Sequence, residues 1–157
     1  MKKLLIAFFF VFCGQMASAC PDYTLWGDQR YTYTAAELYA PRGHSVIAGG
    51  DRNLERCPIN WSNWQGRPTG WVIQEPDFSI TIQKLSGYQV EFRVVSECDT
   101  LLVVNTAARN WYYDDDDNGN LDPKIRFTNP SGDGIYDVWV GTYDGETCNA
   151  QLIVETF

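Results

Sequence analysis

The strongest constraint on the fold is an alternation of apolar and polar residues that recurs along much of the chain. Phe78, Ile80 and Ile82 are each followed by a polar residue, and the same period returns in three later segments. A period of two places successive side chains on opposite faces of a strand, so one face is buried and the other meets water. The strands expected from this alternation are Asp77–Lys84, Tyr88–Ser96, Lys124–Thr128 and Gly134–Thr142.

Two more apolar segments and the turns between the strands complete the expected architecture. Thr100–Asn105 and Ala150–Glu155 are almost continuously apolar, which is typical of central strands. Turn residues recur at a spacing of roughly ten residues, and only the short stretch Tyr33–Tyr39 favours a helix. The pattern predicts an all-β protein, an antiparallel β-sandwich of about eight or nine strands that forms a single domain over residues 20–157.

Residues 1–19 have the character of a secretory signal peptide and are not expected to belong to the fold. Lys2 and Lys3 precede an apolar run of about ten residues, and Ala17-Ser18-Ala19 has the form that signal peptidase accepts. The run is shorter than the ~20 residues that span a bilayer, so no transmembrane segment is predicted. We expect a periplasmic or secreted protein. Lipidation of Cys20 is the alternative, disfavoured because position 17 holds Ala where lipoprotein signals usually carry Leu.

Four cysteines remain once the predicted signal peptide, with its Cys13, is removed. Exported proteins hold cysteines as disulfides, and the lack of any C-x-x-C pair in the sequence argues against a zinc site. Four cysteines allow three pairings. We favour the two bridges that each close a loop within one half of the chain, Cys20–Cys57 and Cys98–Cys148.

Composition narrows the functional class. The net charge of −8 argues against nucleic-acid binding, which requires surfaces rich in Lys and Arg. The chain has one histidine, His44, and no G-x-S-x-G nucleophile turn, so it offers few residues that could form a catalytic triad. We therefore expect a surface or turn histidine, no catalytic residues and no enzymatic activity. A secreted hydrolase with an unrecognised site is the remaining alternative.

The most distinctive chemical motif is the acidic stretch from Asp114 to Asp122. Adjacent carboxylates repel one another unless water or a cation neutralises them, and the order D-x-D-x-N-G matches the opening of a calcium-binding loop. The twelfth position, where such loops carry Glu, is Ile125, so the match is partial and a solvated acidic turn is the alternative. The candidate Ca²⁺ ligands are Asp114, Asp116, Asn118, Asn120 and Asp122.

Three tryptophans, Trp61, Trp64 and Trp71, lie close together in a segment rich in Gly, Pro and polar residues. Aromatic rings held on a loop can stack on sugars or anchor a protein partner. They can equally cap one end of the sandwich as an outlying hydrophobic cluster, which is the interpretation we favour.

Several short strings, taken in order, resemble a known family. They include Pro76-Asp77-Phe78, Cys98-Asp99-Thr100-Leu101-Leu102-Val103, Trp111-Tyr112-Tyr113-Asp114-Asp115 and Val138-Trp139-Val140-Gly141-Thr142-Tyr143. Over roughly residues 46–155 the chain is similar to exported bacterial β-sandwich domains related to the pre-peptidase C-terminal (PPC, peptidase-associated) family. The resemblance implies a jelly-roll-like sandwich that binds or stabilises and does not catalyse, with the acidic turn as a Ca²⁺ site.

The sequence therefore predicts an exported, disulfide-stapled, non-catalytic accessory or binding module, with Ca²⁺ as the cofactor if the acidic turn holds a cation. Its partner is expected to be a protein or a glycan at the cell envelope. The alternative is a carbohydrate- or envelope-binding module that uses the segment of Trp61, Trp64 and Trp71.

Overall fold

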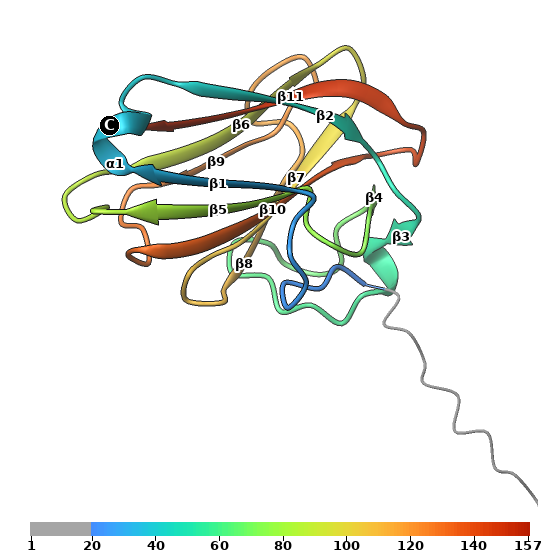
Figure 1. The fold of residues 1–157 in the computed structure, drawn as a ribbon. Coiled ribbons are helices and arrows are strands. Elements are labelled where there is room, and N and C mark those ends of the chain that lie inside the picture. Colours follow the sequence, from blue (N-terminus) through green and yellow to red (C-terminus); the bar gives the residue numbers. More distant parts are fainter. Residues whose placement is uncertain (1–19) are drawn as a thin grey trace, which may run out of the picture.

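The computed structural model describes residues 20–157, and the predicted signal peptide lies outside this part of the chain. Two β-sheets pack face to face, with the short helix α1 (Ala35–Leu38) at one end of the sandwich (Figure 1). Among residues 20–157, no helix is long and apolar enough to cross a membrane. The strands are β1 Gln29–Thr34, β2 Arg42–Ala48, β3 Arg52–Asn53, β4 Trp71–Val72, β5 Phe78–Gln83, β6 Val90–Ser96, β7 Thr100–Asn105, β8 Trp111–Asp114, β9 Lys124–Phe127, β10 Gly134–Thr142 and β11 Cys148–Thr156.

The two sheets differ in size and leave two strand edges side by side. The smaller sheet has the order β2-β11-β6-β9 and is antiparallel. In the larger sheet β10 pairs with β5 and β7, β1 lies outside β5, β8 lies outside β7, and the short strands β3 and β4 extend from the end of β10. Within residues 20–157, β1 pairs only with β5, in parallel, and β2 pairs only with β11. These two edge strands lie at the same open side of the sandwich (Figure 1).

The predicted fold class is confirmed, because the chain forms a two-sheet β-sandwich. The described residues contain eleven strands and not eight or nine. Five strands are not among the six segments expected above, namely β1 to β4, which precede residue 78, and β8. Of these, β3 and β4 have two residues each and are too short to display a period. The helix expected within Tyr33–Tyr39 forms as α1. It starts at a capping box in which the Thr34 hydroxyl accepts from the Glu37 N–H and the Glu37 carboxylate accepts from the Thr34 N–H.

The main hydrophobic core lies between the two sheets. Alternate residues of β10, namely Tyr136, Val138 and Val140, belong to it, as the period of two requires. Strand β7 is buried at all six positions, which agrees with its expected central place. The sheet faces that form this core therefore match those predicted from the alternation.

A second hydrophobic cluster covers the outer face of the larger sheet. Trp139 lies on the opposite face of β10 from Val138 and Val140, yet it is fully buried. The N-terminal segment and the long loop between η1 (Leu54–Arg56) and β4 supply the covering side chains. The buried members of this second cluster are Leu54, Trp61, Val72, Leu101, Val103, Tyr113 and Trp139.

Both disulfides favoured from the sequence are present. Cys20–Cys57 joins the N-terminal segment to the residue after η1, with the two Cα atoms 5.5 Å apart. Cys98–Cys148 joins the β6–β7 turn to the first residue of β11, with Cα atoms 6.6 Å apart. In the chain-entropy description, loops of this length give each bridge a stabilising effect of roughly 3–4 kcal/mol.

Candidate functional site

The three tryptophans of the predicted aromatic segment do not form one exposed platform. Trp61 is 7% exposed and packs edge-on against Trp111 and Tyr113 within the second cluster. Trp64 is 39% exposed and also packs edge-on against Tyr113, with ring centroids 4.9 Å apart. Trp71 is half-buried in β4 and pairs with β10. Trp61 therefore belongs to an outlying hydrophobic cluster, as favoured from the sequence, but this cluster covers the outer face of the larger sheet and not one end of the sandwich.

The acidic stretch turns two of its carboxylates inward. Asp122 is 3% exposed, and its side chain accepts hydrogen bonds from the Ser96 N–H, the Ser96 hydroxyl (2.7 Å) and the Thr100 hydroxyl (3.0 Å). Asp114 Oδ2 accepts from the backbone N–H groups of Asp117 and Lys124. Burial raises the pKa of Asp114, and these backbone bonds oppose the rise. Both carboxylates therefore hold the loop onto the sandwich.

The remaining candidate calcium ligands lie farther out. Asp116 and Asn120 are exposed, and Asn118 donates from Nδ2 to the Val94 carbonyl at 2.8 Å. No group of three or more His, Cys, Asp or Glu side chains within the described residues is arranged to hold a metal ion. Calcium binding at Asp114, Asp116, Asn118, Asn120 and Asp122 stays a prediction.

Calorimetric titration tests this calcium prediction. If the five residues bind the ion, millimolar Ca²⁺ releases heat and raises the melting temperature of the wild-type protein, because a ligand that binds the folded state alone stabilises it. Asp116→Asn should weaken both effects, because the exposed Asp116 carboxylate accepts no hydrogen bond within residues 20–157 that would compete with the ion. A titration that shows neither heat nor a shift of the melting temperature would contradict Ca²⁺ binding by these five residues.

His44 is neither a surface nor a turn histidine, which corrects the expectation from the sequence. It lies within β2, is 9% exposed, and its ring centroid is 4.0 Å from that of Tyr31. Burial lowers the pKa of His44, and Arg42 lowers it further. The expectation failed because His44 occupies an inward position of β2, where its neighbours Gly43 and Ser45 give no apolar signal that marks the buried face.

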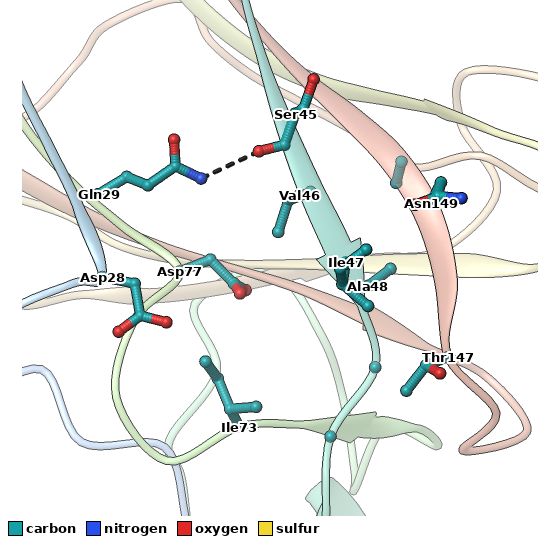
Figure 2. A pocket seen from close by; sticks show the side chains of 13 residues that line it. Asp28, Gln29, Ser45, Val46, Ile47, Ala48, Ile73, Asp77, Thr147 and Asn149 are labelled. Atoms are coloured by element: carbon teal, nitrogen blue, oxygen red, sulfur yellow. Dashed lines mark hydrogen bonds between the residues drawn. The ribbon is translucent and has the colours of Figure 1, made fainter.

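A groove opens where β1 and β2 diverge, at the end of the sandwich opposite α1. Its volume is about 720 Å³. Figure 2 shows Val46 of β2 directed toward Asp28 and Asp77 across this space, and Ile73 at its foot. We call this space the edge groove. Its lining comprises Asp28, Gln29, Ser45, Val46, Ile47, Ala48, Gly49, Gly50, Ile73, Asp77, Thr147, Asn149 and Ala150.

Hydrogen bonds across the groove fix the direction of the β2 backbone. Gln29 Nε2 donates to the Ser45 carbonyl at 2.9 Å (Figure 2), and the Gly49 N–H donates to the Val140 carbonyl of β10 at 3.1 Å. Alternate residues of a strand direct their N–H and C=O groups to the same edge. Ile47 lies midway between Ser45 and Gly49, so its backbone groups face the groove, and its side chain is 61% exposed.

The groove combines an apolar wall with two carboxylates. Asp77 is 6% exposed, and its Oδ2 accepts a 2.7 Å hydrogen bond from the Val140 N–H. Burial raises the pKa of Asp77 to about 7 against the effect of this bond, and the charges of Asp28 and Glu75 raise it further. None of the lining residues is Lys or Arg. The groove therefore suits an occupant that carries apolar and positively charged groups side by side.

Sequence reasoning missed this groove. Its one local trace is the pair Val46-Ile47, two apolar neighbours in a half-buried strand, of which one must point to solvent.

Comparison with known proteins gives little further guidance. No family model matches the chain, and no curated protein matches it. Among solved structures, it is similar to PliG of Aeromonas hydrophila, a periplasmic inhibitor of g-type lysozyme, with 11% identity over 82% of this chain and 98% of that chain and a TM-score of 0.46. We draw no conclusion about function from a likeness this distant.

The resemblance to the pre-peptidase C-terminal family is wrong. No model of that family matches the chain, and the solved structure that it matches is a lysozyme inhibitor. The strings that suggested the family occupy strand positions with simple physical roles. Val138 and Val140 fill the core and Trp139 fills the second cluster, so unrelated sandwiches can share such strings.

Proposed function

We propose that this protein is an exported, non-catalytic binding module that receives an extended segment of a protein partner in the edge groove. The observation that carries the proposal is the open edge of β2 beside an apolar, acidic groove. An extended peptide that adds to a free strand edge gains main-chain hydrogen bonds, and adjacent pockets select its side chains. Export is supported by the two disulfides, which persist in oxidising compartments.

The groove also indicates the chemistry of the partner segment. Val46 and Ile73 would contact an apolar side chain, and Asp28 would attract a Lys or Arg. The exposed Ile47 would pack against the partner from the rim of the groove. Because alternate side chains of an extended segment share a face, a segment in which a basic residue follows two positions after an apolar one fits this lining.

Binding of defined peptides tests the proposal. We expect extended peptides with an apolar residue and a lysine two positions apart to bind more tightly than matched peptides with glutamate in place of the lysine, by about tenfold at low salt. Ile47→Pro removes the N–H that faces the groove without removing a ladder donor to β11, and should weaken binding about tenfold. Fluorescence polarisation measures both effects.

Three further variants serve as controls. Ile47→Ala keeps the backbone donor and should weaken binding less than Ile47→Pro, whereas Asp28→Asn should reduce the preference for lysine. Tyr39→Ala changes a residue that is 70% exposed beyond α1 and should leave binding unchanged. Equal affinity of Ile47→Pro and the wild type, with both shown to be folded by thermal melting, would overturn the edge-groove proposal.

A whole protein belongs in the same test. A g-type lysozyme is one defined choice, since PliG, the protein of the solved structure reported above, is an inhibitor of such an enzyme. The likeness adds no support to the proposal. Inhibition of the lysozyme that is lost in Ile47→Pro and retained in Tyr39→Ala would identify one partner of the groove.

A further inference from the structure

A row of buried polar side chains crosses the outer face of the larger sheet, away from the edge groove. Ser79 of β5 lies opposite Asp137 of β10, and Asp137 lies opposite Asn105 of β7. The three side chains are 3%, 6% and 2% exposed in this order. Polar groups at such depth are normally all paired, because leaving one unpaired costs about 1–3 kcal/mol.

Two of these groups lack a full set of partners. Asp137 Oδ1 accepts a 2.5 Å hydrogen bond from the Ser79 hydroxyl, which itself accepts from the Gly27 N–H. Asp137 Oδ2 makes no hydrogen bond, and no cation pairs with this carboxylate, anywhere in residues 20–157. Asn105 Nδ2 is buried and likewise donates to no acceptor in the described chain. Burial raises the pKa of Asp137 to about 6, as expected for a carboxylate without a counter-charge.

The same two residues line a pocket of about 400 Å³. Tyr23 and Thr24 of the N-terminal segment form one wall, and the turn after β7 forms another. The guanidinium of Arg109, in that turn, lies 6.0 Å from the centroid of the Tyr23 ring, which it covers. A cation is thus already stacked on this ring, so the pocket offers hydrogen-bonding groups rather than a free aromatic face for a sugar.

We propose that this pocket binds a protonated primary amine that stands next to a carbonyl or carboxylate oxygen. Asp137 accepts from the ammonium group, and the Asn105 amide donates to the oxygen. The two residues are direct cross-strand neighbours, whose Cβ atoms lie about 5 Å apart, so a ligand with donor and acceptor on adjacent carbons can bridge them. An ammonium group supplies the counter-charge that Asp137 lacks, which a neutral hydroxyl does not. Both an α-amino acid and the N-terminal residue of a peptide carry this chemistry.

Titration with four small probes, followed by calorimetry and by amide NMR, tests the proposal. We expect alanine, the dipeptide Ala-Ala or both to bind and to shift the side-chain amide signals of Asn105. N-acetylalanine amide, which lacks the ammonium group, and glucose should not bind. Binding of alanine alone would identify free amino acids as the source, and binding of Ala-Ala alone would identify peptide N-termini.

Variants assign the binding to named groups. Asp137→Asn keeps an acceptor for Ser79 but removes the charge, and should weaken binding at least about tenfold. Asn105→Ala should weaken it less, and covers the case in which Asp137→Asn does not fold. Glu97→Gln removes one charge from an exposed side chain and should change nothing. Binding of the acetylated probe, unchanged affinity in a folded Asp137→Asn, or no shift of Asn105 with any amine would overturn the proposal.

Discussion

Replacing Asp122 by alanine is expected to lower the free energy of unfolding by about 2–3 kcal/mol. Its buried carboxylate accepts three hydrogen bonds, two from Ser96 and one from Thr100. Alanine would remove the acceptor of the Ser96 N–H, and would leave the Ser96 hydroxyl only the Cys98 carbonyl and the fully buried Thr100 hydroxyl only Ser96 Oγ as partners. Urea denaturation at pH 7, followed by tryptophan fluorescence, measures the loss as a lower midpoint of unfolding.

Two matched variants separate this role from the effect of charge. Asp122→Asn keeps one acceptor oxygen and should lose less stability than Asp122→Ala. Asp117→Ala removes an exposed carboxylate of the same loop that accepts no hydrogen bond in the described chain, and should change stability by less than about 0.5 kcal/mol. A loss of similar size in Asp117→Ala and Asp122→Ala would show that loop charge, and not the buried bonds, matters.

In the acidic loop, the spacing of residues predicted the turn but not the directions of its side chains. The order of Asp and Asn residues correctly marked a tight turn, since Gly119 has a positive φ of 78° and Asn120 one of 56°. It could not reveal that Asp114 and Asp122 point inward. A carboxylate in a turn can coordinate a cation or accept hydrogen bonds from the protein. For Asp122 the donors are Ser96 of β6 and Thr100 of β7, and for Asp114 they are backbone N–H groups of Asp117 and Lys124, so neither choice follows from the spacing of the acidic residues.

The strands of the sheets were more predictable than the segments that cover the outer face of the larger sheet. Alternation placed Val138 and Val140 on one face of β10 and Trp139 on the other, because a strand reverses its side chains at every residue. The burial of Trp139 was not predictable in the same way. It depends on the loop that carries Trp61, which has no period to interpret.

The edge groove lay beyond sequence reasoning for a different reason. It forms between β1 and β2, which belong to different sheets and are held apart by their own partners β5 and β11. No local pattern encodes the separation of two strands that do not pair. Asp77 is the first residue of the predicted strand Asp77–Lys84 and stands directly before β5 in the structure, and its burial follows only from the packing of β10 against it.

The second large effect concerns this residue and pH. The pKa of Asp77 is about 7 in the folded protein, against 3.8 for an ordinary Asp, because burial disfavours the charged form. Between these two values the folded state binds more protons than the unfolded state. The contribution of Asp77 to stability is therefore complete below about pH 4 and is lost as the pH rises toward 7, by a few kcal/mol at most.

Asp77→Asn should remove the dependence of stability on pH that Asp77 causes, because the asparagine amide does not titrate. Its side-chain oxygen still accepts the hydrogen bond from the Val140 N–H. At pH 7 we expect the variant to be at least as stable as the wild type, with an advantage of roughly 1–3 kcal/mol that shrinks as the pH falls to 4. Asp137 and Asp114 also have raised pKa values, so the wild-type profile alone does not isolate Asp77. The difference between variant and wild type, taken from urea midpoints at each pH, removes their shared contribution.

A difference in the free energy of unfolding that is constant from pH 4 to 7 would mean that Asp77 is ionised throughout this range. In that case Asp77 would bring a full negative charge to the edge groove, and a basic partner segment would be attracted more strongly at neutral pH.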